Sequence, residues 1–540
     1  MDEAADAPSR FPAGILAAVL AMALAVGWLH HYAYSAQQLA ERYVRVLGPR
    51  SMPFKSQTLT MQRAALAVQG VLPVYGTSEL YCCGQPYNAA TFYYNAPTGF
   101  SVFNVGYPVT EDLFWAETFG ALGNALRGKK LVVSDSPWFM SAQGISEPAY
   151  AHTYSPEVAM VFTFDAPVPL PLRAAVARRM LDFPQTLTGQ PMMVAALRDL
   201  AHGGWRSDLA YALVDPVGRL AAWQAQLQDA RQTVSTIGGL AYPHGAPSAA
   251  ARRAVALTEA TGLARVWDWV VLRLTPGGNT PLWQLLSQGM QGATPALNPN
   301  VPTHPKTINW TQVLTQATAA ATAATRTNPF GVATSQWKSC SDISPVAGKE
   351  CQQALALYAQ GRSNHFGTVL PIPQSWVSGV KSCLCWTDLD LEFEMLRAVQ
   401  ARPLAWLQPV QGFLADYTQY SAPARRVIYD RYMAIANAEG IPATTFETHD
   451  TDRLYMNSFG HMSQRGWVYA DRLLNLFWHN QLGEVRANME RGGSVGILFP
   501  HALNCPTTVA CEGVANVQPL PGELAKLPVD LGLPPLPHAA

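Results

Sequence analysis

A serine and a histidine at opposite ends of the chain are the residues best placed to do chemistry. Ser78 lies in the segment GTSEL, directly after an apolar run at residues 71–75. A strand that ends there would leave Ser78 on the turn at the edge of a sheet, where its hydroxyl can meet a substrate. His461, in the segment YMNSFGH, is the candidate base, because an imidazole can take the serine proton and return it to a leaving group. The pair predicts serine-dependent acyl transfer or ester cleavage.

The other candidate residues support ordinary structural roles more readily. Glu79 could assist Ser78, but an acidic residue at the start of a helix usually serves the helix dipole. Trp138 and Trp467 could line a sugar-binding cleft, and core packing is the alternative. The chain has no set of metal ligands at a known spacing, no phosphate-binding glycine loop and no dinucleotide fingerprint. We therefore expect neither a metal nor a cofactor.

Alternating strand and helix patterns predict the elements that must position this pair. Apolar runs at residues 71–75, 100–105 and 131–133 predict strands, and apolar residues recur with helical spacing at 113–126. Near the end of the chain, residues 403–409 and 443–447 again predict strands, on either side of a helix at 422–439. This β-α-β order is typical of a parallel sheet covered by helices, in an α/β fold.

The composition excludes one class of partner and the first residues predict another. The chain carries 37 basic and 37 acidic residues, and only 14% of its residues are charged, so no strong field exists to attract nucleic acid. Residues 11–28 are free of charge and are about long enough to span a bilayer. The residues before them are acidic, and no clear signal-peptidase site follows. We expect an uncleaved transmembrane anchor at 11–34.

The cysteines decide the expected side of the membrane. Arg42, Arg45 and Arg50 follow the anchor, which by the positive-inside rule weakly favours a cytoplasmic body, although long domains often ignore that bias. The chain has eight cysteines, and six of them form close pairs in loop-like sequence, as in an oxidising compartment. Buried thiols or zinc ligands are the alternative, but the usual C-x-x-C spacing is absent. The pairs are Cys340 with Cys351, Cys383 with Cys385, and Cys505 with Cys511. We expect a single-pass protein of the cytoplasmic membrane with its body in the periplasm or outside the cell.

Changes in composition and in the alternation of strands and helices divide the chain into a folded domain and the segments that precede, interrupt and follow it. The alternation of strands and helices is interrupted by an Ala-, Thr-, Pro- and Asn-rich stretch, which we interpret as an insertion, and the chain ends in a Pro-rich tail. The expected parts are a short segment at 1–10, the anchor at 11–34, the first half of the α/β domain at 60–235, the insertion at 236–361, the second half at 362–499 and the tail at 500–540.

Six segments in the same order resemble the DltD family, whose members are membrane-anchored proteins with an SGNH-like esterase fold. The likeness covers most of residues 60–235 and 390–480. It is carried by VLPVYGTSEL, VFNVGYPVTEDL, KKLVVSDSPWFMSAQGI, ARPLAWLQPVQGFLADYTQYS, RRVIYDRYMAIANAEGI and YMNSFGHMSQRGWVYADRLL. The resemblance implies a three-layer SGNH-like fold with a central parallel sheet, Ser78 as nucleophile and His461 as base. It also implies a membrane acyltransferase of the MBOAT type as partner, and D-alanine loaded onto a teichoic-acid-like polymer.

The chain departs from the family pattern at two places that matter for catalysis. The acidic residue that the family places three positions before its histidine is Ser458 here. Asp452 or Asp450 could supply the carboxylate instead, Asn457 or Ser458 could orient a neutral imidazole, or hydrolytic activity could be lost. The second block lacks the family's small residue for an oxyanion donor, which leaves the amides of Ser78 and Gly106 as candidates.

The sequence is consistent with three hypotheses about the function. The first is a relay in which Ser78 passes an acyl group to hydroxyls of an exported polymer. The insertion, the cysteines and the altered histidine block indicate a divergent member, for which the alternative is acetylation of a Gram-negative, cellulose-like exopolysaccharide. The second reading is a non-catalytic assembly factor, and the third is a free-standing polysaccharide esterase.

Overall fold

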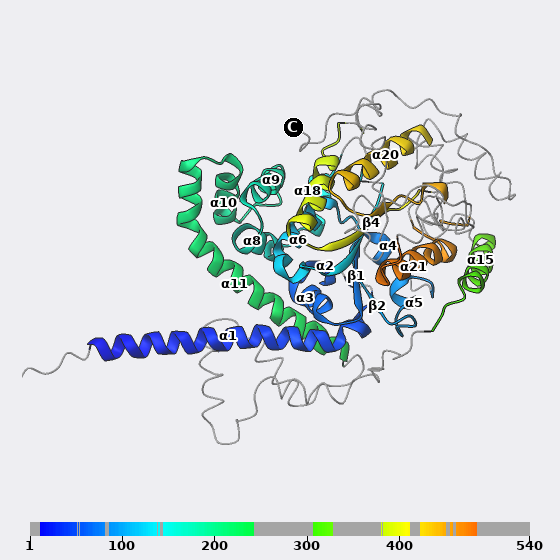
Figure 1. The fold of residues 1–540 in the computed structure, drawn as a ribbon. Coiled ribbons are helices and arrows are strands. Elements are labelled where there is room, and N and C mark those ends of the chain that lie inside the picture. Colours follow the sequence, from blue (N-terminus) through cyan, green and yellow to red (C-terminus); the bar gives the residue numbers. More distant parts are fainter. Residues whose placement is uncertain are drawn as a thin grey trace, which may run out of the picture. The chain divides into compact units, whose positions relative to one another are not determined.

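A parallel sheet of five strands forms the centre of the computed structural model (Figure 1). The model describes residues 11–50, 52, 54–81, 86–137, 139–140, 144–241, 306–327, 380, 382–410, 422–449, 454–456 and 461–482. The strands are β1 (Val71–Gly76), β2 (Ser101–Gly106), β3 (Lys130–Asp135), β4 (Arg402–Leu407) and β5 (Ala443–Thr444), in the order β2-β1-β3-β4-β5. All four neighbouring pairs are parallel. The predicted α/β fold with a central parallel sheet is confirmed.

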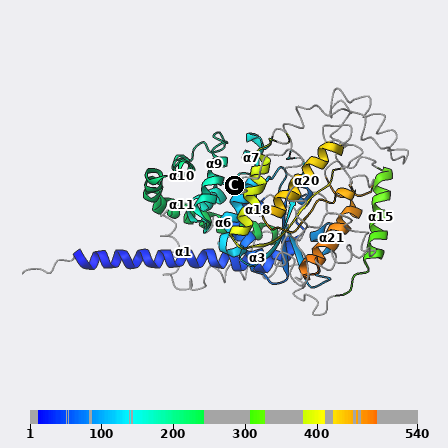
Figure 2. The same ribbon diagram turned by 45° about the horizontal axis from the view of Figure 1, so that its top comes forward.

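Helices cover both faces of the sheet, which gives the three layers (Figures 1 and 2). One face packs on α3 (Leu59–Ala67), α6 (Asp112–Leu122) and α18 (Cys385–Ala398), and the other on α5 (Ala89–Phe92) and α21 (Gln464–Trp478). α20 (Ala422–Ala438) packs against α18 and β5. The remaining elements around the sheet are α2 (Phe54–Gln57), α4 (Ser78–Tyr81), the 3₁₀ turns at Gly123–Leu126 and Glu447–His449, and α7 (Glu147–Thr153), α8 (Pro156–Asp165), α9 (Leu170–Met180) and α10 (Pro191–His202).

Alternate side chains along β1 pack into the cores on opposite faces of the sheet. Leu72 and Val74 point into the core shared with α21. Tyr75 points the other way, where its ring meets those of Trp115 and Phe119 on α6 edge-on, with centroids 5.3 and 4.9 Å away. Because both faces are buried, the strand is apolar throughout instead of alternating with polar residues.

The chain divides into two compact units, and the sheet belongs to the larger one. The smaller unit contains residues up to Tyr43 of α1 (Phe11–Leu47) and those from Trp223 in α11 (Trp205–Ala241). Within α1, the stretch Ile15–Leu47 is long and apolar enough to cross a membrane, and its most apolar part is exposed. The predicted anchor at 11–34 therefore lies in a helix that continues without a break to Leu47.

Lys55 joins the last turn of α1 to the sheet domain. Its ammonium group donates to the carbonyls of Leu47, Gly48 and Arg50 at 2.9–3.0 Å and lies 4.4 Å from the centre of the Phe103 ring on β2. Leu47 is the last residue of α1, and a cation is favourable at the carboxyl end of a helix. Burial lowers the pKa of Lys55 to about 7. The last residues of the anchor helix are thus part of the folded domain.

Part of the predicted insertion is an ordered helix of the sheet domain. The Ala- and Thr-rich piece forms α15 (Trp310–Thr327), which packs on α21, and Arg465 of α21 donates to the Thr318 hydroxyl at 2.9 Å. Alanine is the best helix former, which explains why this biased sequence is helical. Residues 242–305 and 328–379 of the insertion and its flank lie outside the described residues, as does the predicted tail at 500–540.

Among the predicted cysteine pairs, Cys383 and Cys385 form a disulfide at the start of α18. The pairs Cys340 with Cys351 and Cys505 with Cys511 lie outside the described residues.

Candidate functional site

Ser78 lies where the sequence predicts it, on the turn that follows β1. The strand ends at Gly76, and Ser78 is the first residue of the short helix α4. The Ser78 side chain is half-buried, whereas its neighbours Thr77, Glu79 and Leu80 are buried. The turn therefore presents one hydroxyl at the carboxyl end of the sheet, which is where open α/β sheets bind ligands.

Two glycines allow the chain to approach itself closely around this serine. A Cβ atom on Gly76 would lie 2.3 Å from the Glu79 carboxylate oxygen. A Cβ atom on Gly106, at the end of β2, would lie 2.7 Å from the Leu80 Cβ and 2.8 Å from the Thr77 carbonyl oxygen. Side chains at either position would push the serine turn away from the strand ends. Gly106, predicted as an oxyanion donor, thus lies against the residues that flank Ser78.

The loop that follows Gly106 contains a residue in an unusual backbone conformation. Val109 has a φ of 68°, which a β-branched residue rarely adopts. The Thr110 amide and hydroxyl both donate to the Tyr107 carbonyl, at 3.2 and 2.7 Å, and the Tyr107 ring stacks on His152 at 4.8 Å. These contacts hold the loop in place beside the serine turn.

His461 is positioned by the residues on its carboxyl side. Met462 forms an isolated antiparallel bridge with Met456, and the Ser463 amide donates to the Tyr455 carbonyl at 2.8 Å. The Ser463 hydroxyl caps α21, accepting from the amides of Arg465 and Gly466 at 3.0 and 3.2 Å. The histidine therefore precedes a capped helix whose first turn is tied to the preceding loop.

The structure brings the predicted pair together. The His461 Nε2 atom lies 3.0 Å from the Ser78 Oγ atom, and both side chains are partly buried. Burial lowers the pKa of His461 below its usual value, so the ring is neutral at pH 7. A neutral imidazole whose Nε2 atom accepts from a serine hydroxyl is the arrangement that general-base activation needs.

Glu79 has a different role from the helix-dipole partner that the sequence suggests. It is 3% exposed, and its carboxylate accepts from the Thr77 amide at 2.9 Å. Burial raises the pKa of Glu79 to about 7, and hydrogen bonds from Thr77, Ser134 and Gln408 oppose that rise. The carboxylate fixes the backbone just before Ser78 from inside the protein, so it braces the serine turn.

Four of the predicted site residues and one of the tryptophans lie outside the described residues. These are Asp450, Asp452, Asn457, Ser458 and Trp138. The partner that orients His461 therefore stays a prediction. Trp467 is 3% exposed and belongs to the core on the α21 side, so it packs in the core and does not line a cleft.

Sequence reasoning missed a second group of polar residues behind the serine turn. At the end of β3, the Ser134 hydroxyl accepts from the Trp406 indole at 2.6 Å, and the Asp135 carboxylate accepts from the Tyr432 hydroxyl at 2.6 Å. Gln408, just after β4, donates to Ser134 at 3.3 Å. The available signal was positional: in a parallel sheet, residues that end neighbouring strands meet at one edge, and Ser134 and Asp135 end β3 as Ser78 follows β1.

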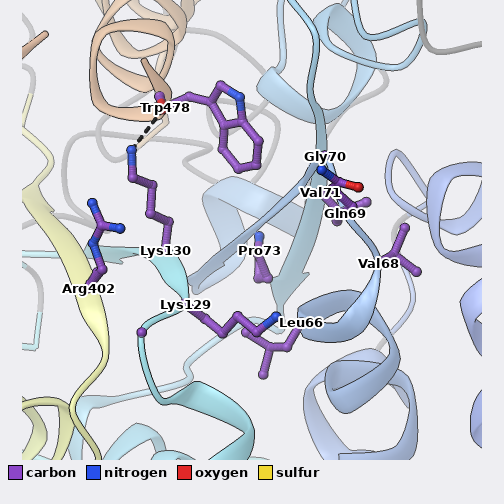
Figure 3. A pocket seen from close by; sticks show the side chains of 11 residues that line it. Leu66, Val68, Gln69, Gly70, Val71, Pro73, Lys129, Lys130, Arg402 and Trp478 are labelled. Atoms are coloured by element: carbon purple, nitrogen blue, oxygen red, sulfur yellow. Dashed lines mark hydrogen bonds between the residues drawn. The ribbon is translucent and has the colours of Figure 1, made fainter. Parts of the chain in front are cut away.

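A cavity of about 370 Å³ lies at the other end of the sheet (Figure 3). Its wall includes the first residues of three strands, Val71, Lys130 and Arg402, whereas Ser78 follows the last residue of β1. The Lys130 ammonium donates to the carbonyls of Phe477 and Trp478 at 2.7 and 2.8 Å, so this cation serves to hold the end of α21. The cavity is not part of the serine–histidine site.

A family model and one curated relative match the chain along most of its length. The model of the DltD protein family matches residues 50–359 and 385–479. The chain belongs to the DltD family. The protein named "Protein DltD" of Bacillus subtilis (strain 168) is 20% identical over 469 residues, which cover 86% of this chain and 96% of that protein. Ser78, Gly106 and His461 all fall inside the residues that the DltD model matches. The family resemblance stated from the sequence is confirmed.

Proposed function

We propose that this DltD-family protein relays an acyl group through Ser78 to hydroxyl groups of an exported cell-surface polymer. The observation that carries the proposal is the 3.0 Å contact between the His461 Nε2 atom and the Ser78 hydroxyl. The pair lies at the carboxyl end of a parallel sheet, and the family to which the chain belongs supports a role in D-alanylation of a cell-envelope polymer.

The relay consists of two acyl transfers that use the same base. In the first, the Ser78 oxygen attacks the acyl carbonyl while its proton passes to His461, and the bond between the acyl carbon and the donor breaks as the donor takes that proton. In the second, a polymer hydroxyl gives its proton to His461 and attacks the ester, and Ser78 regains its proton as it leaves. Both steps conserve the acyl group as an oxygen ester.

Both steps pass through a negatively charged tetrahedral intermediate that needs hydrogen-bond donors. The amides of Ser78 and Gly106 are the proposed donors, since Gly106 lies against the serine turn. One such donor contributes about 3 kcal/mol to transition-state stabilisation. Asp452, Asn457 and Ser458 remain the proposed candidates for orienting His461.

The proposed donor of the acyl group is a membrane acyltransferase of the MBOAT type, and the proposed acceptor is a teichoic-acid-like polymer or an exported polysaccharide. D-alanine is the group that family membership favours. Acetate is the second candidate, because the cysteines and the serine at position 458, before His461, indicate a divergent member. The helix Ile15–Leu47 supports a single-pass anchor, with the sheet domain on the outer side of the cytoplasmic membrane.

Mass spectrometry of ester-linked groups on the cell-surface polymer tests this proposal. Cells that carry Ser78→Ala or His461→Ala are expected to lose the modification while protein levels hold, and the mass lost identifies the acyl group. Ser101→Ala, at the amino end of β2, is the matched control and should leave the modification unchanged.

Two outcomes would replace the relay with another function. A polymer that keeps its modification in both variants, but loses it when the whole protein is absent, would assign the protein to assembly of the acylation complex. Increased modification in Ser78→Ala cells, together with cleavage of a small chromogenic ester by the wild-type protein alone, would assign it as a free-standing esterase.

A further inference from the structure

Three carboxylates from three separate elements meet in the interior on the α6 side of the sheet. Asp112 begins α6, Asp135 ends β3 and Glu392 lies within α18. One oxygen from each lies within 4.8 Å of the others. The three residues are 5%, 3% and 0% exposed, so water cannot solvate their charge.

Among the residues that the structure describes, the side chains around this cluster do not neutralise it. Both carboxylate oxygens of Glu392 are buried and lack a hydrogen-bond partner among the described residues. Asp135 accepts one hydrogen bond, from the neutral hydroxyl of Tyr432. The nearby Arg179 guanidinium is bound in a two-point contact by Asp388, at 2.7 and 2.8 Å, and is therefore already paired.

Burial of three carboxylates side by side requires either protons or a cation. If protons alone held the cluster together, a protonated carboxyl would donate to its neighbour. The unpartnered oxygens of Glu392 show no such hydrogen bond. Isolated buried charges are costly, and metal coordination is one of the few arrangements that relieves the cost.

We propose that Asp112, Asp135 and Glu392 bind a divalent cation, for which calcium is the best fit. The three oxygens all lie within 4.8 Å of one another, so an ion equidistant from them lies at most about 2.8 Å from each, a range that includes the calcium–oxygen distances of about 2.3–2.6 Å. Magnesium requires distances of about 2.0–2.1 Å and a stricter geometry. The all-carboxylate ligand set disfavours zinc and copper, which prefer histidine and cysteine.

The position of the cluster gives the ion a structural role next to the serine turn. Its ligands join β3, α6 and α18, which are far apart in the sequence. Asp135 directly follows Ser134, whose hydroxyl hydrogen-bonds the Glu79 carboxylate. A bound cation would therefore stabilise the end of β3. Through the hydrogen bond between Ser134 and Glu79, it would also stabilise the serine turn. This site is independent of the acyl-transfer reaction proposed above.

Metal analysis of the full-length protein, purified in detergent, tests the site. After treatment with EDTA and dialysis, the wild type is expected to take up about one equivalent of calcium by inductively coupled plasma mass spectrometry. Its melting temperature should fall on stripping and return when calcium is added. Glu392→Gln keeps the shape of the side chain but removes a ligand charge, so it should bind calcium about 100-fold or more weakly and lose the thermal response.

Glu117→Gln is the matched control. Glu117 is buried on the same helix as Asp112, but its carboxylate accepts from the Tyr150 hydroxyl at 2.6 Å and it is not one of the three residues whose oxygens come together, so this variant should bind calcium like the wild type. Equal calcium binding by both variants would overturn the assignment. If Glu392→Gln does not fold, calorimetric titration of the stripped wild type decides: no saturable binding of calcium, manganese or magnesium at millimolar concentrations rejects the site. Neither result depends on whether Ser78 is the nucleophile.

Discussion

The serine–histidine pair and the carboxylate cluster lie at the ends of neighbouring parallel strands, yet they differ in what surrounds them. Ser78 follows β1 and is half-buried, and it meets a neutral base that satisfies its hydroxyl. Asp135 ends β3 and is buried among other carboxylates. The same edge of the sheet thus presents one accessible serine–histidine pair and one enclosed cluster of acidic side chains. Because the Ser78–His461 pair is accessible, it is suited to a reaction with a polymer. Because the carboxylate cluster is enclosed, it is suited to binding an ion.

The largest expected effect is the loss of acyl transfer in Ser78→Ala. Without the hydroxyl no ester can form, so transfer should fall by about 10⁴-fold or more. Stability should change by no more than about 0.5 kcal/mol, because the side chain is not part of the core. Single-turnover transfer of a labelled acyl group in isolated membranes measures the first quantity, and thermal unfolding measures the second. A large fall in melting temperature would instead assign Ser78 a structural role.

Gly106→Ala should affect both catalysis and stability, because it changes the packing between β2 and the serine turn. The added Cβ atom would lie within 2.8 Å of the Thr77 carbonyl, a backbone group that cannot rotate away. We expect a cost of about 1–3 kcal/mol from overpacking. Displacement of the turn should also reduce transfer by about 10²-fold, because misplacement by about 1 Å has effects of this size.

Gly128→Ala is the control for this change. Gly128 lies in the turn before β3, where an added Cβ meets no atom within 4 Å, and its φ of 69° alone should cost stability. Transfer by the folded Gly128→Ala protein should match that of the wild type. Equal transfer by Gly106→Ala would show that the contact between β2 and the serine turn does not position Ser78.

The pH dependence of transfer tests the buried state of His461. Burial lowers the pKa of the imidazole, and the neutral form is the base, so activity should persist below the usual histidine pKa of about 6.5 and fall only as the pH drops through the lowered value. The same linkage makes the buried neutral ring favour the folded state above about pH 6.5, and this contribution is lost on acidification. A kcat/KM profile with an acidic limb at or above pH 6.5 would contradict this environment.

The contrast between the two groups also explains what could be predicted from the sequence. Ser78 and His461 belong to local segments with their own pattern, an apolar run that ends in Gly-Thr-Ser and a helix start, so each could be placed on its element. Asp112, Asp135 and Glu392 belong to no common motif, and only the crossing of α6 and α18 over the sheet brings them together. Burial of Glu79 is likewise a consequence of packing beneath the strand ends.

Differences at the borders of the elements have local causes. The strand predicted at 443–447 ends after Thr444, because Phe446 adopts a φ of 50° and leads into a 3₁₀ turn. The helix Trp310–Thr327 was hidden by the biased composition of its segment, which also suits a linker; its packing on α21 determines its structure. The bounds of β1 to β4 differ from the prediction by at most two residues at either end, since apolar runs specify buried parallel strands well.

Ser463→Ala should have the smallest effect, and it tests whether His461 depends on the helix that follows it. The Ser463 hydroxyl accepts from two amides in the first turn of α21, and loss of such a cap costs about 1 kcal/mol. Because His461 lies two residues earlier, transfer should fall several-fold while the acidic limb of the pH profile stays in place. Ser463→Asp restores a capping oxygen and should restore both stability and transfer. If Ser463→Ala loses stability but transfers at the wild-type rate, the cap of α21 does not help to position His461. The bridge between Met456 and Met462 would then position the base.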